Sequence, residues 1–88
     1  MSKKIFQTFI NANVIGVTLE HNGFQGGDAG HGGFVKITIK DLSGTCMMLN
    51  GKDCESFELE FKGDAERITL LSALKMITKE LEENTKIF

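Results

Sequence analysis

Three segments of the chain alternate apolar and polar residues, and this pattern restricts the fold more than any other feature of the sequence. The segments cover residues 15–20, 34–41 and 56–62. Successive side chains of a strand point to opposite faces, so each segment predicts a strand with one buried side and one side in water. The chain is therefore expected to contain a sheet with one covered face.

The remaining strands follow from turn signals and from the N-terminal sequence. The first two alternating segments are expected to pair as antiparallel neighbours across a long glycine-rich loop. Residues 45–50 are expected to form a further strand, because Asn50-Gly51 favours a hairpin turn after it. Residues 1–12 fit a helix or a strand, and we favour a strand or an arm that contacts another subunit.

After Gly63 the apolar residues change to helical spacing. Asp64 suits the N-cap position, and we expect the helix to continue to about Glu83. Its apolar stripe consists of Ile68, Leu70, Leu71, Leu74, Ile77 and Leu81. The predicted fold is α+β: a two-layer sandwich, with an antiparallel sheet of about four strands and one C-terminal amphipathic helix, in a single domain over residues 1–88.

Such a sandwich leaves apolar surface uncovered. A helix is about 10 Å wide and strands lie about 4.8 Å apart, so one helix covers about two strands. Ile15, Val17 and Phe57 are therefore expected to stay partly open. Because uncovered apolar patches usually mark interfaces, we expect a homo-oligomer, unless residues 1–10 of the same chain cover the gap.

Composition excludes several classes of partner. The formal net charge is −2, and no dense basic face suggests binding to duplex nucleic acid. No apolar run approaches the length of a membrane span, and no signal peptide is recognisable, so we expect a cytoplasmic protein with Cys46 and Cys54 reduced. The spacing of His21, Asp28 and His31 does not match common zinc sites, so no metal or cofactor is expected.

The glycine-rich loop is the candidate binding site. Six of the eleven residues from 23 to 33 are glycine, which is costly to order and therefore needs a reason. Glycines allow successive backbone N–H groups to converge on an anion, and aromatic rings can stack on a base. We expect a small anionic ligand, most simply a nucleotide, held by Phe24, Gln25, Gly26, Gly27, Asp28, Gly30, His31, Gly32 and Phe34. The competing interpretation is a flexible hairpin loop without a ligand.

Two other functions remain open. An acidic C-terminal half, including Glu58 and Glu60, would suit a protein-interaction module that acts as an inhibitor or an adaptor of a host protein. Asp28 and His31 could instead form an orienting pair in a small hydrolase. We regard a non-catalytic binding protein as the better interpretation, because no serine or cysteine nucleophile lies near this pair in the sequence.

The segments GFQGGDAGHGGF and GDAERITLLSALKMI, in a short acidic chain without Pro, Trp or Tyr, resemble small accessory proteins of bacteriophages. These include counter-defence proteins that bind a host factor or sequester a nucleotide signal. The resemblance is one of overall character. It implies a binding role rather than particular site residues.

Overall fold

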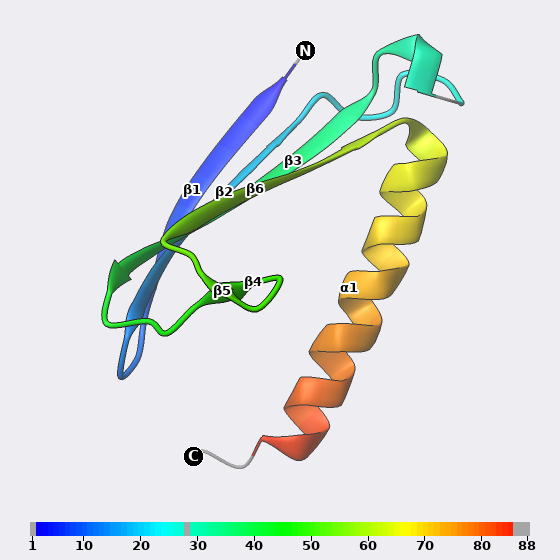
Figure 1. The fold of residues 1–88 in the computed structure, drawn as a ribbon. Helices are drawn as coiled ribbons and strands as arrows, with labels where there is room; N and C mark the ends of the chain where they lie inside the picture. Colours follow the sequence, from blue (N-terminus) through cyan, green and yellow to red (C-terminus); the bar gives the residue numbers. More distant parts are fainter. Residues whose placement is uncertain (1, 28, 86–88) are drawn as a thin grey trace.

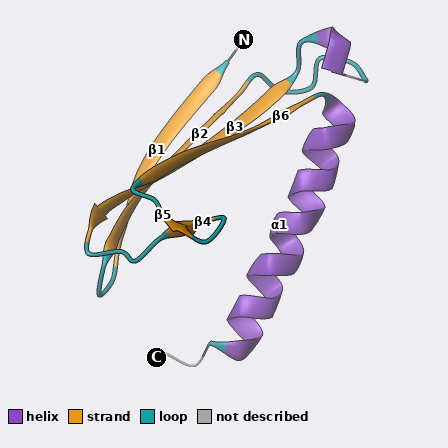
Figure 2. Ribbon diagram, viewed as in Figure 1, coloured by secondary structure: helices purple, strands orange, loops and turns teal. Residues whose placement is uncertain are grey.

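The computed structural model describes residues 2–27 and 29–85 and has one main sheet followed by one helix (Figure 1). The sheet has the order β1-β2-β3-β6, and all neighbours are antiparallel. Its strands are β1 (Lys3–Ile10), β2 (Val14–His21), β3 (Phe34–Ser43) and β6 (Ser56–Lys62), and the helix is α1 (Asp64–Asn84). A 3-10 turn at Ala29–His31 and a short hairpin of β4 (Met48–Leu49) and β5 (Lys52–Asp53) complete it (Figure 2). The predicted α+β fold is confirmed.

The strand register gives the sheet one apolar face. Leu19 lies opposite Ile5 on one side and Ile37 on the other, and Ile37 lies opposite Leu59. Helix α1 lies on this face and packs mainly against β3 and β6. The apolar alternation in all three predicted strands therefore points to the face where it was expected.

The opposite face of the sheet carries alternating charges. A row across all four strands runs Lys4, Glu20, Lys36 and Glu60. Opposite charges on neighbouring strands attract, which favours this register. Because lysines separate the glutamates, the face is mixed in charge rather than acidic.

The strand predicted over residues 45–50 is reduced to β4 and lies outside the main sheet. Strand β3 already pairs with β2 on one side and β6 on the other, so no ladder position beside it remains for this segment. Only Met48 and Leu49 pair, with β5. The hairpin signal itself is confirmed, since Asn50 and Gly51 have φ values of 52° and 80°. The N-terminal residues, as β1, supply the fourth strand instead.

The start of α1 also differs from the prediction. Gly63, with φ 109°, occupies the N-cap position, and Asp64 is the first helical residue. The carboxylate of Asp64 accepts hydrogen bonds from the glycine-rich loop and so does not cap its own helix. The helix ends at Asn84, close to the predicted end.

The helix diverges from the sheet towards its C-terminus (Figure 1). Among the described apolar residues, only Val35 and Leu70 are buried. Ile15, Val17 and Phe57 are half-buried, as the width of a single helix predicted. Within residues 2–27 and 29–85, no helix is both long and apolar enough to cross a membrane.

Candidate functional site

The glycine-rich loop holds a carboxylate of its own chain. The backbone N–H of Gln25 donates to Oδ1 of Asp64 at 3.0 Å. The N–H groups of Gly26 and Gly27 donate to Oδ2 at 2.8 and 3.2 Å. Three successive N–H groups thus converge on one anion, which is the arrangement that the glycines predicted. Here the anion is the side chain of Asp64.

The contact is reciprocal. The carbonyl oxygen of Gly27 accepts hydrogen bonds from the N–H groups of Asp64 at 2.9 Å and Ala65 at 3.4 Å. These are N–H groups of the first helical turn, which have no partner within a helix. We call this set of contacts, between residues 25–27 and residues 64–65, the loop–helix clip. It fixes the start of α1 against the loop between β2 and β3.

The clip changes the acidity of Asp64. The N–H of Gln25 contributes most to holding the pKa of Asp64 below its usual value of 3.8. Partial desolvation opposes this, and the N–H groups of Gly26 and Gly27 and the Arg67 guanidinium reinforce it. The site therefore favours the ionised carboxylate.

This lowered pKa predicts a defined loss of stability in acid. A carboxyl group with a lower pKa in the folded state stabilises that state fully above its unfolded pKa, here the usual value of 3.8. The contribution should decline as the pH falls below about 4, and it should vanish below the folded pKa. Urea unfolding of the wild-type chain and of Asp64→Asn between about pH 7 and pH 2 measures it. The gap between the two midpoints should be constant near neutrality and should close in acid. A gap that does not vary with pH would show that the ionised carboxylate is not what holds the clip.

Asn22 closes the base of the loop, and sequence reasoning missed it. Its Nδ2 donates to the carbonyl oxygen of Gly32 at 2.9 Å, and its Oδ1 accepts from the N–H of Phe34 at 3.0 Å. The side-chain amide of Asn22 thus donates and accepts at the other end of the loop, as a backbone amide of a neighbouring strand would. The signal in the sequence was an asparagine next to Gly23, at the end of an alternating segment.

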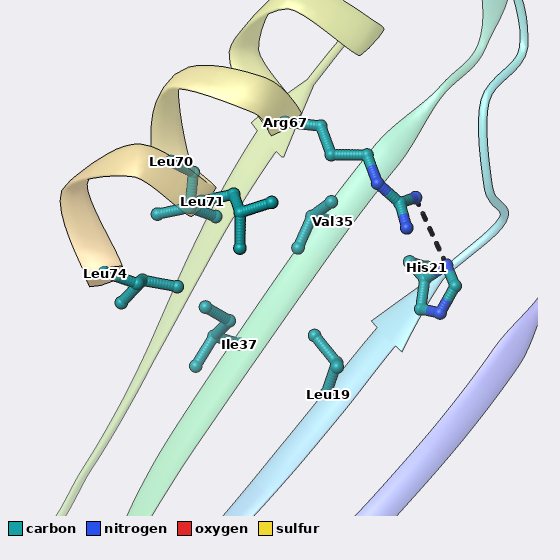
Figure 3. Close-up of a pocket in the computed structure, with 8 residues that line it drawn as sticks. All are labelled: Leu19, His21, Val35, Ile37, Arg67, Leu70, Leu71 and Leu74. Atoms are coloured by element: carbon teal, nitrogen blue, oxygen red, sulfur yellow. Dashed lines mark hydrogen bonds between the residues drawn. The ribbon is translucent and has the colours of Figure 1, made fainter. Parts of the chain in front are cut away.

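Arg67 of α1 contacts Phe24 of the glycine-rich loop and His21 of β2, and Figure 3 shows the contact with His21. Its guanidinium lies 5.0 Å from the centre of the Phe24 ring, within the range of a cation–π contact. Its Nη1 lies 3.3 Å from Nδ1 of His21, which also accepts the N–H of Gly23 at 3.1 Å. Arginine and a backbone N–H can only donate, so Nδ1 of His21 is the acceptor that both groups face.

An apolar cavity of about 200 Å³ lies between α1 and the sheet. We call it the apolar wedge, and Arg67 and His21 form its one polar end (Figure 3). Its apolar lining comes from Leu19, Val35 and Ile37 of the sheet and from Leu70, Leu71 and Leu74 of the helix.

The structure separates the residues of the predicted ligand site. Gln25, Gly26 and Gly27 bind Asp64, and the His31 ring lies beside Gly26, where an added Cβ would be 3.6 Å from Cδ2 of that ring. Phe34 lies opposite Lys62, on the charged face of the sheet. Phe24 instead lies beneath Arg67 of α1. Asp28 is outside the described residues, and with it the predicted Asp28–His31 pair.

The other candidate groups are dispersed. Cys46 and Cys54 are free thiols, and Sγ of Cys54 donates to the carbonyl oxygen of Ser56 at 3.1 Å. No three His, Cys, Asp or Glu side chains gather as metal ligands in the part of the chain that the structure describes. No protein-family model, curated protein or solved structure matches this chain.

Proposed function

We propose that the chain is a non-catalytic protein-interaction module that acts as a homo-oligomer in the cytoplasm. The observation that supports this is the excess of surface on the single chain. Its accessible surface is 6760 Å², for a mass of 9.7 kDa. A compact monomer of that mass exposes roughly 5,100 Å².

The shape of the chain agrees with its area. The radius of gyration is 14.9 Å, against roughly 12 Å for a compact domain of this length. The excess of roughly 1,600 Å² exceeds the ~800 Å² that each partner buries in an interface of standard size. Much of the exposed surface is apolar, because the wedge is open and α1 diverges from the sheet. Contact with another protein surface would remove it from water.

The first consequence is an assembly larger than one chain. Light scattering on the purified protein at micromolar concentration should give at least twice the 9.7 kDa chain mass. The charged face is the control surface, so reversing Glu58 and Glu60 should leave the mass unchanged. A folded species of single-chain mass would contradict self-association.

A nucleotide is the second candidate ligand, and the contact between Phe24 and Arg67 favours it. The Phe24 side chain is 65% exposed with a guanidinium over its ring. A base could stack on the open side of this ring, and Arg67 could pair with a phosphate. Since Asp64 fills the N–H cluster formed by residues 25–27, a phosphate would rely on Arg67 rather than on those N–H groups.

Thermal-shift measurements with cyclic and linear nucleotides test this candidate. A nucleotide at about 100 times its Kd should stabilise the chain by about 2.7 kcal/mol. Phe24→Ala should weaken binding by about 1–3 kcal/mol, the usual contribution of one stacked base. Phe6→Ala, an equally open phenylalanine on the charged face, is the matched control. The candidate fails if no nucleotide produces a shift.

A further inference from the structure

The apolar face of the sheet is only half covered. Helix α1 packs on β3 and β6 and faces β2 across the apolar wedge, at Leu19 and His21, so β1 and the rest of β2 form the half of the face with no helix over it. We call this half the β1–β2 strip; its apolar residues are Ile5, Phe9, Ile15 and Val17, and Gln7 lies among them, opposite Val17. Two strands span about the width of one helix, so the strip has room for a second helix.

Helix α1 in turn has more apolar surface than its own sheet covers. Residues 68–78 include a single charged side chain, Lys75. Leu70 and Leu74 face the sheet. The opposite side of the helix carries a second uncharged stripe of Ala65, Ile68, Ser72 and Met76, all exposed, with Ile68 at 55% and Met76 at 62%. A helix segment that is largely uncharged on both sides is typical of one that is buried on both sides.

We infer that α1 of a second copy of this chain lies on the β1–β2 strip, so that two copies cover each other reciprocally. In a single chain no helix covers the strip and no sheet covers the second stripe. In a two-fold symmetric dimer, the second stripe of each copy would lie on the strip of the other, so both surfaces would be covered. The dimer then has two helices between two sheets. The excess of roughly 1,600 Å² per chain provides the surface that such an interface needs. This inference rests on the proposed self-association.

Two isoleucines of the same strand provide a matched test. Ile5 belongs to the strip and is 42% exposed, whereas Ile10 lies outside it and is 72% exposed. Ile5→Lys should raise the dimer dissociation constant by about 30-fold or more, as expected for a central interface residue, and should give the single-chain mass in dilute solution. Ile10→Lys should keep the wild-type mass. If the Ile5→Lys protein stays dimeric while the wild type is dimeric, this inference fails and the proposed function stands. A monomeric wild type would overturn both.

Cross-linking decides the matter even if Ile5→Lys does not fold. In a background with Cys46→Ser and Cys54→Ser, proteins carrying Ile5→Cys and Met76→Cys are mixed and treated with a short bismaleimide. The expected product joins one chain of each kind, because the second stripe of one copy lies on the strip of the other. Ile10→Cys should give no such product with Met76→Cys. Absence of the mixed product, with wild-type mass retained, would refute the arrangement.

Discussion

Leu70→Ala is expected to remove about 2–5 kcal/mol of folding free energy, the usual cost of deleting a buried leucine. Leu70 is 8% exposed, and with Val35 it is one of two buried apolar residues in the described chain. It is also the one buried residue of α1, and it faces the sheet. A chain of this length has roughly 4–13 kcal/mol of stability in total, so the loss is a large fraction of it.

Urea unfolding at one fixed protein concentration measures this effect, because self-association makes stability depend on concentration. Met48→Ala is the control, since Met48 is exposed in the β4–β5 hairpin and its truncation should change stability by no more than about 0.5 kcal/mol. Equal midpoints for the two variants would show that Leu70 does not anchor the helix.

Gly26→Ala should have the second large effect, a loss of about 1–3 kcal/mol. Gly26 has φ 110°, a conformation that residues with a Cβ rarely adopt, and its N–H makes the 2.8 Å hydrogen bond to Asp64. An alanine that relaxes towards negative φ would turn this N–H away from the carboxylate. The loss should therefore include part of the loop–helix clip as well as backbone strain.

Gly44→Ala separates these two contributions. Gly44 also has positive φ, at 68°, but an added Cβ there meets nothing within 4 Å and the residue lies outside the clip. Both variants should lose stability at neutral pH. In Gly26→Ala the acid-sensitive contribution of Asp64 should shrink, whereas in Gly44→Ala it should persist. If acid affects both variants equally, Gly26 has no special role in holding Asp64.

The sequence predicted most of the sheet because its signals are local. The alternation around Val17, Ile37 and Leu59 depends only on neighbours along the chain, and it identified the strands and their apolar face correctly. The segment 45–50 has similar composition, but it could pair with β3 only if one edge of β3 were not already paired with another strand. That is a property of the assembled sheet, which no local pattern contains.

The contacts of the candidate site could not be predicted from the sequence for the same reason: they join residues that are distant along the chain. Capping rules consider residues within one turn, and they place Asp64 at the start of its own helix. The actual partners of its carboxylate lie 37 to 39 residues earlier in the chain. The contact between Arg67 and Phe24 likewise forms only after the loop docks. From the glycines we expected N–H groups that bind a separate ligand, whereas the N–H groups of residues 25–27 bind Asp64 of the same chain.

Because α1 is anchored at its N-terminal end, a small tilt there produces a larger displacement of its C-terminal end. The helix has 21 residues and is held by its first turns, at the clip and around Leu70. At 1.5 Å per residue it extends about 31 Å, so a tilt of about 10° at the anchored end moves the far end by about 5 Å. A rearrangement among Gly26, Gly27 and Asp64 that tilts the helix by this angle would displace Asn84 by a distance comparable to one helical turn. Spectroscopic labels at the C-terminal end of α1 would therefore detect rearrangements of the contacts between the glycine-rich loop and Asp64.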